Sequence, residues 1–176
     1  NKEYELKVIE VFGQRIKITG SPETNILGNA IHSYFAVDYD CLASDDQTNL
    51  ARIILKNWSM ESSIDPADLV EAGQRLSAFI EKSYKDYKAY KEWPISMRNE
   101  EGQIVQGWID LLVDTPAGFV IIDHKDYPGK DVLDRMKKYV PQLRTYKESV
   151  EKATGRPVID MLLHLPISGL ILRLLP

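Results

Sequence analysis

The chain has almost no cysteine and no long apolar run. Cys41 is the only cysteine among 176 residues, so no internal disulfide can form, which agrees with a reducing cytoplasm. One cysteine also excludes a zinc ribbon or any four-cysteine cluster made by this chain alone. No apolar run approaches the roughly 18 residues that a membrane-spanning helix needs, and no secretory signal stands at the start. We therefore expect a cytoplasmic protein with no membrane partner.

Charge of neither sign dominates the composition. The 22 basic and 26 acidic residues give a net charge of −4. This charge argues against a protein that binds nucleic acid over its whole surface, but it allows a local basic face. Hydrophobic content of 44% is ordinary for a globular protein, and the length fits one domain spanning residues 1–176. Because the chain begins with Asn1 and not with methionine, we expect it to be part of a longer polypeptide, although processing of the chain would give the same start.

The first half of the chain predicts one hairpin and three helices. Alternating residues over 3–18 predict a short hairpin around Gly13. Ser21 has the chemistry of a helix cap and is followed by apolar residues at helical spacing. Two further helices are predicted over 46–58 and 65–84, and Asp65 is expected to cap the second of them.

The second half is mostly extended. A turn is predicted at 99–102, and a long helical stretch over 131–154 contains Pro141, which should kink or split it. The predicted strands cover 88–98, 103–114, 118–125, 156–165 and 170–175. This order predicts a mixed α/β fold with a central sheet flanked by helices, and not a doubly wound nucleotide-binding fold.

Three charged residues interrupt the apolar runs of two of these strands. Asp110 lies in the first strand, and Asp123 and Lys125 lie at the end of the next. Burying a charge is costly unless it is paired or bound to a metal ion. These residues are therefore the candidates for a site.

The loop between the two strands, residues 115–118, decides whether the two acids meet. A two-residue and a four-residue loop give the same register, in which Asp110 faces Asp123 with Cβ atoms roughly 4.5–5.5 Å apart and Lys125 shares their face. A three-residue loop with a bulge would put the carboxylates on opposite faces. Because Pro116 does not suit the tight two-residue turns, we favour the four-residue loop.

Two facing carboxylates repel each other unless a cation lies between them. Carboxylate oxygens suit Mg²⁺ or Mn²⁺, and such an ion holds phosphate and acidifies a bound water. Lys125 beside it would orient that water or stabilise charge on phosphate oxygens. The alternative is a charged cluster on a solvated sheet face, but the Asp-x-Lys at the end of an apolar strand favours the metal site.

These residues resemble the PD-(D/E)xK nuclease superfamily, whose central motif is matched by Gly107-x-x-Asp110 followed by Asp123-x-Lys125. More narrowly, the chain is similar to the RecB-type nuclease domain that ends helicase–nucleases of the UvrD/Rep class, the AddA and RecB proteins. Three further matches follow in family order: "LGNAIHSYF" with Gly28 and His32, "EWPIS" with Glu92, and "QLRTY" with Gln142 and Tyr146.

The resemblance implies a restriction-endonuclease-like core and a DNA nuclease that uses Mg²⁺, with Mn²⁺ as a substitute in vitro. It also implies that the chain is the C-terminal fragment of a helicase–nuclease. Its partners would be DNA, the helicase domains of the same polypeptide and a second helicase–nuclease subunit. The branch of the family that carries an iron–sulfur cluster needs four cysteines and is excluded.

The resemblance also assigns roles to residues. Asp110, Asp123 and His32 would bind the metal ion together with the backbone carbonyl of His124, and Lys125 would be the catalytic lysine. On the residues alone, His32 on a helix face is more typical of a hydrogen-bonded core or boundary residue.

Gln142 and Tyr146 share a helix face and would reach the DNA backbone, although ordinary packing explains them nearly as well. Around them lies a basic stretch, residues 130–148, with a local charge of +3 that could hold phosphates. Lys138 and Arg144 are the DNA-binding candidates there, and a solvated helix face is the alternative.

Several features stay open on sequence alone. Asp126 follows Lys125 where the family often has serine or threonine, and it could pair with that lysine or hinder phosphate. Trp93 and Trp108 could stack on bases but are more typical of a core, and His164 is expected at the surface or boundary. The alternative function is a catalytically silent DNA-binding or docking module of a helicase complex.

Overall fold

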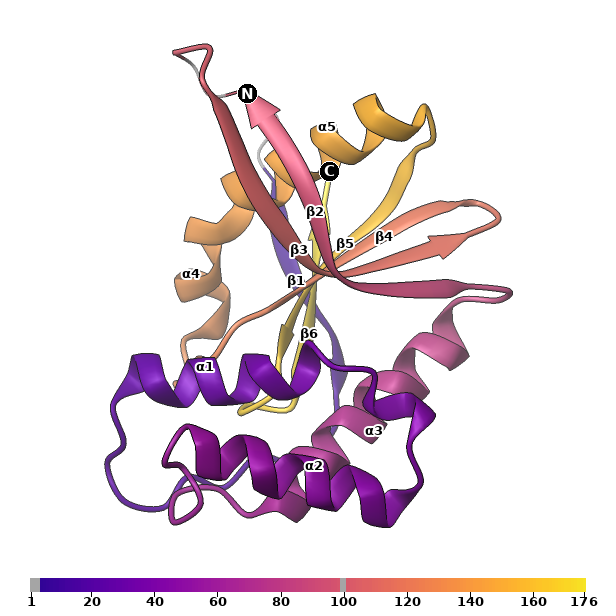
Figure 1. The fold of residues 1–176 in the computed structure, drawn as a ribbon. Helices are drawn as coiled ribbons and strands as arrows, with labels where there is room; N and C mark the ends of the chain where they lie inside the picture. The colour runs from indigo at the N-terminus through magenta and orange to yellow at the C-terminus, as the bar shows by residue number, and fades with distance from the viewer. Residues whose placement is uncertain (1–3, 99–100) are drawn as a thin grey trace.

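The computed structural model describes residues 4–98 and 101–176. Residue 3 of the predicted hairpin and residues 99–100 of the predicted turn lie outside this part. The described residues form a six-stranded sheet with the order β1-β6-β5-β4-β3-β2, in which β4 and β5 are parallel and the other neighbours antiparallel (Figure 1). The predicted mixed α/β fold is confirmed.

The elements follow the predicted order with shifted ends. The strands are β1 (Glu5–Val11), β2 (Lys88–Arg98), β3 (Ile104–Thr115), β4 (Gly118–His124), β5 (Val158–Leu165) and β6 (Leu170–Leu175). The helices are α1 (Thr24–Phe35), α2 (Ser44–Asn57), α3 (Pro66–Ser83), α4 (Val132–Met136) and α5 (Val140–Thr154), with short 3₁₀ turns η1 (Tyr39–Cys41) and η2 (Lys137–Tyr139). No helix in residues 4–98 and 101–176 is both long and apolar enough to cross a membrane.

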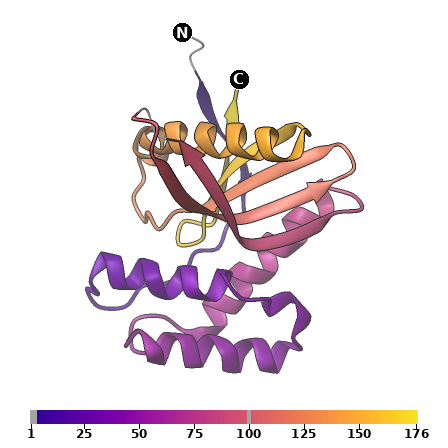
Figure 2. The same cartoon turned by 45° about the horizontal axis from the view of Figure 1, so that its top comes forward.

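Helices cover both faces of the sheet, with α1 to α3 on one side and α4 and α5 on the other (Figures 1 and 2). Strand β4 lies in the middle and is buried along its whole length. Val120 and Ile122 pack toward α1 to α3, whereas Phe119 and Ile121 pack toward α5. A strand buried on both faces reads as a continuous apolar run, so a charged residue at its end must be paired.

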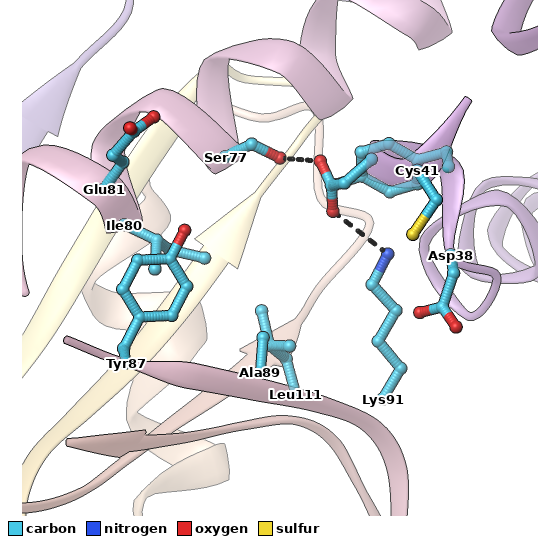
Figure 3. Close-up of a pocket in the computed structure, with 11 residues that line it drawn as sticks. Asp38, Cys41, Ser77, Ile80, Glu81, Tyr87, Ala89, Lys91 and Leu111 are labelled. Atoms are coloured by element: carbon cyan, nitrogen blue, oxygen red, sulfur yellow. Dashed lines mark hydrogen bonds and ion pairs between the residues drawn. The ribbon is translucent and has the colours of Figure 1, made fainter. Parts of the chain in front are cut away.

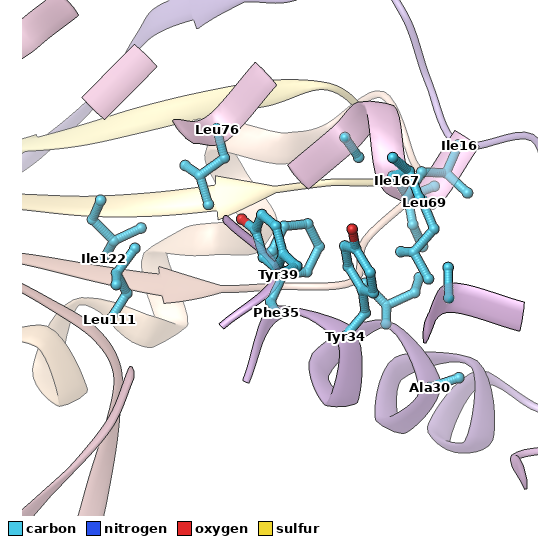
Figure 4. Close-up of a cluster of buried hydrophobic side chains, with 14 of the residues drawn as sticks. Ile16, Ala30, Tyr34, Phe35, Tyr39, Leu69, Leu76, Leu111, Ile122 and Ile167 are labelled. Carbon is cyan, nitrogen blue, oxygen red and sulfur yellow. The ribbon is translucent and has the colours of Figure 1, made fainter. Parts of the chain in front are cut away.

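The core under α1 is rich in aromatic rings (Figure 4). The rings of Tyr34 and Tyr39 stack with centroids 4.8 Å apart, and Phe35 meets both edge-on. Their burial anchors α1 against the sheet, because aromatic side chains contribute large apolar areas. This anchoring fixes the helix that carries His32.

Two details of the first half were predicted wrongly. The segment after Gly13 does not fold back as a second strand, because β1 pairs instead with β6, from Glu5 opposite Leu175 onward. Ser21 is not the cap of α1, since Glu23 holds that position without a side-chain hydrogen bond.

Two predicted helix signals are confirmed. Asp65 caps α3, and its carboxylate accepts a hydrogen bond from the Ala67 amide at 2.9 Å. Pro141 stands in the first turn of α5 and separates it from α4 and η2, as expected for a residue that lacks an amide donor.

The turn between β3 and β4 has the predicted register but not the favoured length. Thr115 pairs with Gly118, so the loop has two residues and not four. The Thr115 hydroxyl donates to the Gly118 carbonyl at 2.7 Å and accepts from the Ala117 amide at 3.2 Å. Gly118 has a φ of +146°, a backbone conformation that residues with a side chain rarely adopt.

Replacing Gly118 with alanine is therefore expected to destabilise the chain. A Cβ there would meet the Pro157 carbonyl oxygen at 2.5 Å, so strain and overpacking together should cost roughly 2–4 kcal/mol. Gly155→Ala is the matched control, because Gly155 also has a positive φ but no atom within 4 Å of its Cβ position. Urea unfolding of both variants measures the difference, and equal losses would contradict this account of the turn.

Candidate active site

The carboxyl end of β4 holds a buried ion pair. Asp123 is only 2% exposed, and its Oδ2 lies 2.6 Å from the Lys125 Nζ. The same ammonium donates to Gln142 Oε1 at 3.2 Å and lies 4.1 Å from the centre of the Tyr139 ring. Residues from β4, η2 and α5 thus meet at one point. The ion pair with Lys125 offsets the free-energy cost of burying the Asp123 carboxylate.

Asp110 joins this cluster from β3. The β3–β4 ladder ends with Leu111 opposite Ile122, next to Asp110 and Asp123. The Asp110 Oδ2 accepts the backbone N–H of His124 at 2.8 Å. Burial and the charge of Asp123 raise the pKa of Asp110 to about 7, against the lowering effect of the His124 amide. Metal-free Asp110 therefore carries a proton over much of the acidic range.

Glu92 marks a bend next to the two acids. It has a φ of +51°, which is rare for a residue with a side chain, and the pairs on either side of it place it opposite Asp110. Beyond the bend, Ile95 and Ile109 pack into the cluster around α5. The outer arm of the β2–β3 hairpin therefore rises beside α5 (Figures 1 and 2) and flanks the site.

His32 reaches the cluster from α1 but is held by another residue. Its Nε2 lies 3.2 Å from Asp126 Oδ2, while its Nδ1 lies 4.0 Å from Asp110 Oδ2. Burial lowers the pKa of His32, but the hydrogen bond and charge of Asp126, with the charges of Asp110 and Asp123, leave it raised overall. Asp126 thus pairs with His32 and not with Lys125.

His164 is buried and not at the surface, contrary to the prediction. It is 1% exposed, and its Nδ1 lies 2.9 Å from the Nδ1 of His124, with the Phe35 ring against both. Burial lowers the pKa of His164 to about 3 and that of His124 well below its usual range, so both rings are neutral. The parallel ladder of β4 and β5 aligns the two histidines and so fixes the backbone at His124.

The four predicted DNA-contacting residues lie in different places: two lie at the buried cluster and two are exposed. Gln142 lies in the cluster, and its Nε2 donates to the Tyr146 hydroxyl at 2.8 Å. Tyr146 is 6% exposed. Lys138 is exposed, with its Nζ 5.0 Å from the centre of the Tyr139 ring, whereas Arg144 stacks over Tyr4 beside β1.

The basic stretch is partly neutralised by neighbouring acids. Three of its cations form ion pairs: Arg135 with Asp131 at 3.5 Å, Lys137 with Asp134 at 3.3 Å, and Lys147 with Glu151 at 2.9 Å. Such exposed pairs weaken the local positive field. Lys138, which lies beside the cluster through Tyr139, is the better placed of the two predicted DNA-binding cations.

The donors at the site fit a divalent cation in type and charge. Asp110 and Asp123 are largely buried carboxylates, and burial together with the charge of Asp123 raises the pKa of Asp110. A hard cation between the two carboxylates would relieve their repulsion. In the described part of the chain, no three histidine, cysteine or acidic side chains lie close enough to enclose a metal ion. The site thus has ligands of a suitable type, but they do not yet surround a common point, and His32 Nδ1 lies 4.0 Å from Asp110 Oδ2.

A separate cavity of about 410 Å³ lies between η1, α3 and β2 (Figure 3). Lys91 lines this cavity. Its Nζ lies 3.5 Å from Asp40 Oδ2 and 3.8 Å from the centre of the Tyr39 ring, and it donates to the Val37 carbonyl. None of the predicted site residues lines this cavity. Asp40, which pairs with Lys91, also accepts a hydrogen bond from the Ser77 hydroxyl, which indicates a structural role for Lys91.

A family model of the PD-(D/E)XK nuclease superfamily matches residues 3–174, nearly the whole chain. The chain belongs to this superfamily. The match accounts for the mixed sheet and for the conjunction of Asp110, Asp123 and Lys125 at its centre. The resemblance and the fold class predicted from these residues are both confirmed.

Similar proteins are named as subunits of an ATP-dependent helicase/nuclease. The one from Desulforamulus reducens is 36% identical over 90 residues, 49% of this chain and 7% of that protein. Those from Thermoanaerobacter sp. and Clostridium botulinum are 35% and 32% identical over 48% and 43% of this chain. The chain thus aligns with about 7% or less of the length of these relatives.

Sequence reasoning missed two participants. Tyr139 lies under two lysines, and an aromatic residue inside a basic stretch was the available signal. The pairing of Asp126 with His32 joins distant parts of the chain. The departure from the family pattern at Asp126 pointed only to an unusual residue and not to its partner.

Proposed function

We propose that the chain is a nuclease domain that hydrolyses DNA phosphodiester bonds with Mg²⁺ or Mn²⁺. The observation that carries the proposal is the gathering of Asp110, Asp123 and Lys125 at the end of β4 in a member of a nuclease superfamily. A bound cation would supply charge to hold the phosphate and a water of lowered pKa.

The chain's own residues would divide the work. The carboxylates of Asp110 and Asp123, His32 and the carbonyl of His124 would hold the cation. Lys125 would turn its ammonium from Asp123 toward the phosphate oxygens and stabilise the charge that grows there. Gln142 and Tyr146 would position Lys125 through their hydrogen bonds.

The path of the DNA would run between α5 and the outer arm of the β2–β3 hairpin. Lys138 is exposed beside the cluster, and Trp93 and Trp108 are 39% and 56% exposed instead of forming core. Exposed aromatic rings on this arm support base stacking on a single strand. Arg144 would contact the DNA further along, toward β1.

The relatives support a proposal about the assembly. We propose that residues 1–176 form one nuclease domain of a cytoplasmic helicase–nuclease, because the similar proteins are helicase/nuclease subunits of which this chain covers a small part. A second helicase–nuclease subunit would be a further partner.

A silent binding module is the second candidate, because the described residues bring no three histidine, cysteine or acidic side chains together around a metal ion. Incubating the chain with labelled single- and double-stranded DNA and Mg²⁺, Mn²⁺, Ca²⁺ or EDTA separates the two. We expect cleavage with Mg²⁺ or Mn²⁺ and none with EDTA. Tight binding that is indifferent to metal, without cleavage, would contradict the nuclease and support the module.

A further inference from the structure

Asp126 lies in the loop that leaves β4 and is pressed against α1. Its Oδ2 lies 3.2 Å from His32 Nε2. Gly28 is one turn before His32 on the same helix, and a Cβ there would meet the same Oδ2 at 2.9 Å. The glycine therefore leaves room for the carboxylate, and the pairing depends on both elements.

The pairing decides which nitrogen of His32 carries the proton. A carboxylate only accepts hydrogen bonds, so a neutral imidazole beside it places its single proton on Nε2. The lone pair then belongs to Nδ1, the nitrogen that faces Asp110 Oδ2 at 4.0 Å. Without Asp126, the carboxylate that remains near the ring is Asp110 on the Nδ1 side, and its charge would favour a proton on Nδ1.

Lys125 does not compete for Asp126. Its ammonium is taken by Asp123 at 2.6 Å and by Gln142 at 3.2 Å. Asp126 is largely buried, and within the described residues its second oxygen, Oδ1, has no hydrogen-bond partner. A direct bond from Oδ1 to a cation is thus the competing role that an experiment must separate.

We propose that Asp126 is a positioning residue that holds His32 in the Nε2–H tautomer and presents Nδ1 to a divalent cation beside Asp110. The inference rests on the proposed cation site. Carboxylates that orient histidine ligands in this way change metal affinity by about 10- to 100-fold when they are removed.

Two measurements on the metal-free and Mn²⁺-titrated chain test the proposal. Long-range ¹H–¹⁵N NMR, at a pH where His32 is neutral, reports its tautomer directly, and calorimetry reports Mn²⁺ affinity. We expect Nε2–H in the wild type, a mixed or inverted tautomer in Asp126→Thr, and about 10- to 100-fold weaker Mn²⁺ binding in that variant. Asp126→Asn keeps an accepting oxygen and should restore part of both signals.

The controls separate positioning from direct binding and from charge. In a His32→Ala background, Asp126→Thr should cause no further loss of Mn²⁺ affinity. Asp134→Asn removes an exposed carboxylate that pairs with Lys137 and should change neither readout.

Three results would overturn the inference. One is an Nδ1–H tautomer in the wild type, and another is an unchanged tautomer in Asp126→Thr. The third is an equal loss of affinity with and without His32, which would make Asp126 itself a ligand. A wild-type chain that binds no Mn²⁺ would instead overturn the cation site and the proposed function, while the metal-free tautomer still decides the role of Asp126.

Discussion

Replacing Lys125 with alanine is expected to lower the rate of DNA cleavage by about 10²- to 10³-fold, the usual loss when a preorganised electrostatic group is removed from a reacting centre. Lys125 lies against the two acids, with its ammonium 2.6 Å from Asp123. Within residues 4–98 and 101–176, no second lysine or arginine forms an ion pair with Asp123, so no neighbour replaces it. Single-turnover cleavage of labelled DNA with saturating Mg²⁺ measures the effect on the chemical step.

Lys138→Ala is the matched control. Both ammonium groups lie against the Tyr139 ring, Lys125 at 4.1 Å and Lys138 at 5.0 Å from its centre, but Lys138 is exposed at the surface. Its loss should weaken DNA binding in a salt-dependent way with little change in the single-turnover rate at saturating enzyme. A Lys125→Ala chain that cleaves within a few-fold of the wild type would remove this residue from the mechanism.

Asp110→Asn is expected to make the metal-free chain more stable than the wild type at pH 8 and hardly different at pH 4. Burial and the charge of Asp123 raise the folded-state pKa of Asp110 to about 7, whereas the pKa of an unfolded aspartate stays near its usual 3.8. Between these values the folded chain binds the extra proton, so the unfolding free energy of the wild type falls as pH rises. A pKa difference of one corresponds to about 1.4 kcal/mol.

Urea unfolding with EDTA between pH 4 and pH 8 checks this difference, and Asp134→Asn serves as the exposed control. The asparagine oxygen can still accept the His124 amide that Asp110 accepts at 2.8 Å, so the variant changes charge more than packing. Saturating Mn²⁺ should reverse the order, because an ion that binds only the folded state stabilises it. A difference between wild type and variant that is flat across this pH range would show that the folded-state pKa of Asp110 is not raised.

The central part of the site was predictable because local chemistry determines it. Two of the three loops considered for residues 115–118 share one register, and either of them predicts Asp110 opposite Asp123. The three-residue loop, which would separate the acids, is ruled out by the pairing of Thr115 with Gly118. The structure has the two-residue loop because Thr115 and Gly118 hydrogen-bond across it. The error in loop length therefore did not disturb the site.

What failed depends on contacts between distant parts of the chain. The predicted hairpin around Gly13 is absent from the described residues because β6, at the other end of the sequence, pairs with β1. The burial of His164 follows from its parallel alignment with His124, and no local pattern reports a parallel partner. Asp126 meets His32 only because α1 packs across the end of β4, which a sequence pattern does not specify.

A crystal of the chain soaked in Mn²⁺, with data collected at the manganese absorption edge, shows whether Asp110 and Asp123 share a cation. We expect an anomalous peak between the carboxylates of Asp110 and Asp123, with the Nδ1 of His32 turned toward it. Strong density for the protein with both acids on opposite faces of the sheet, and no anomalous peak near either, would contradict this expectation.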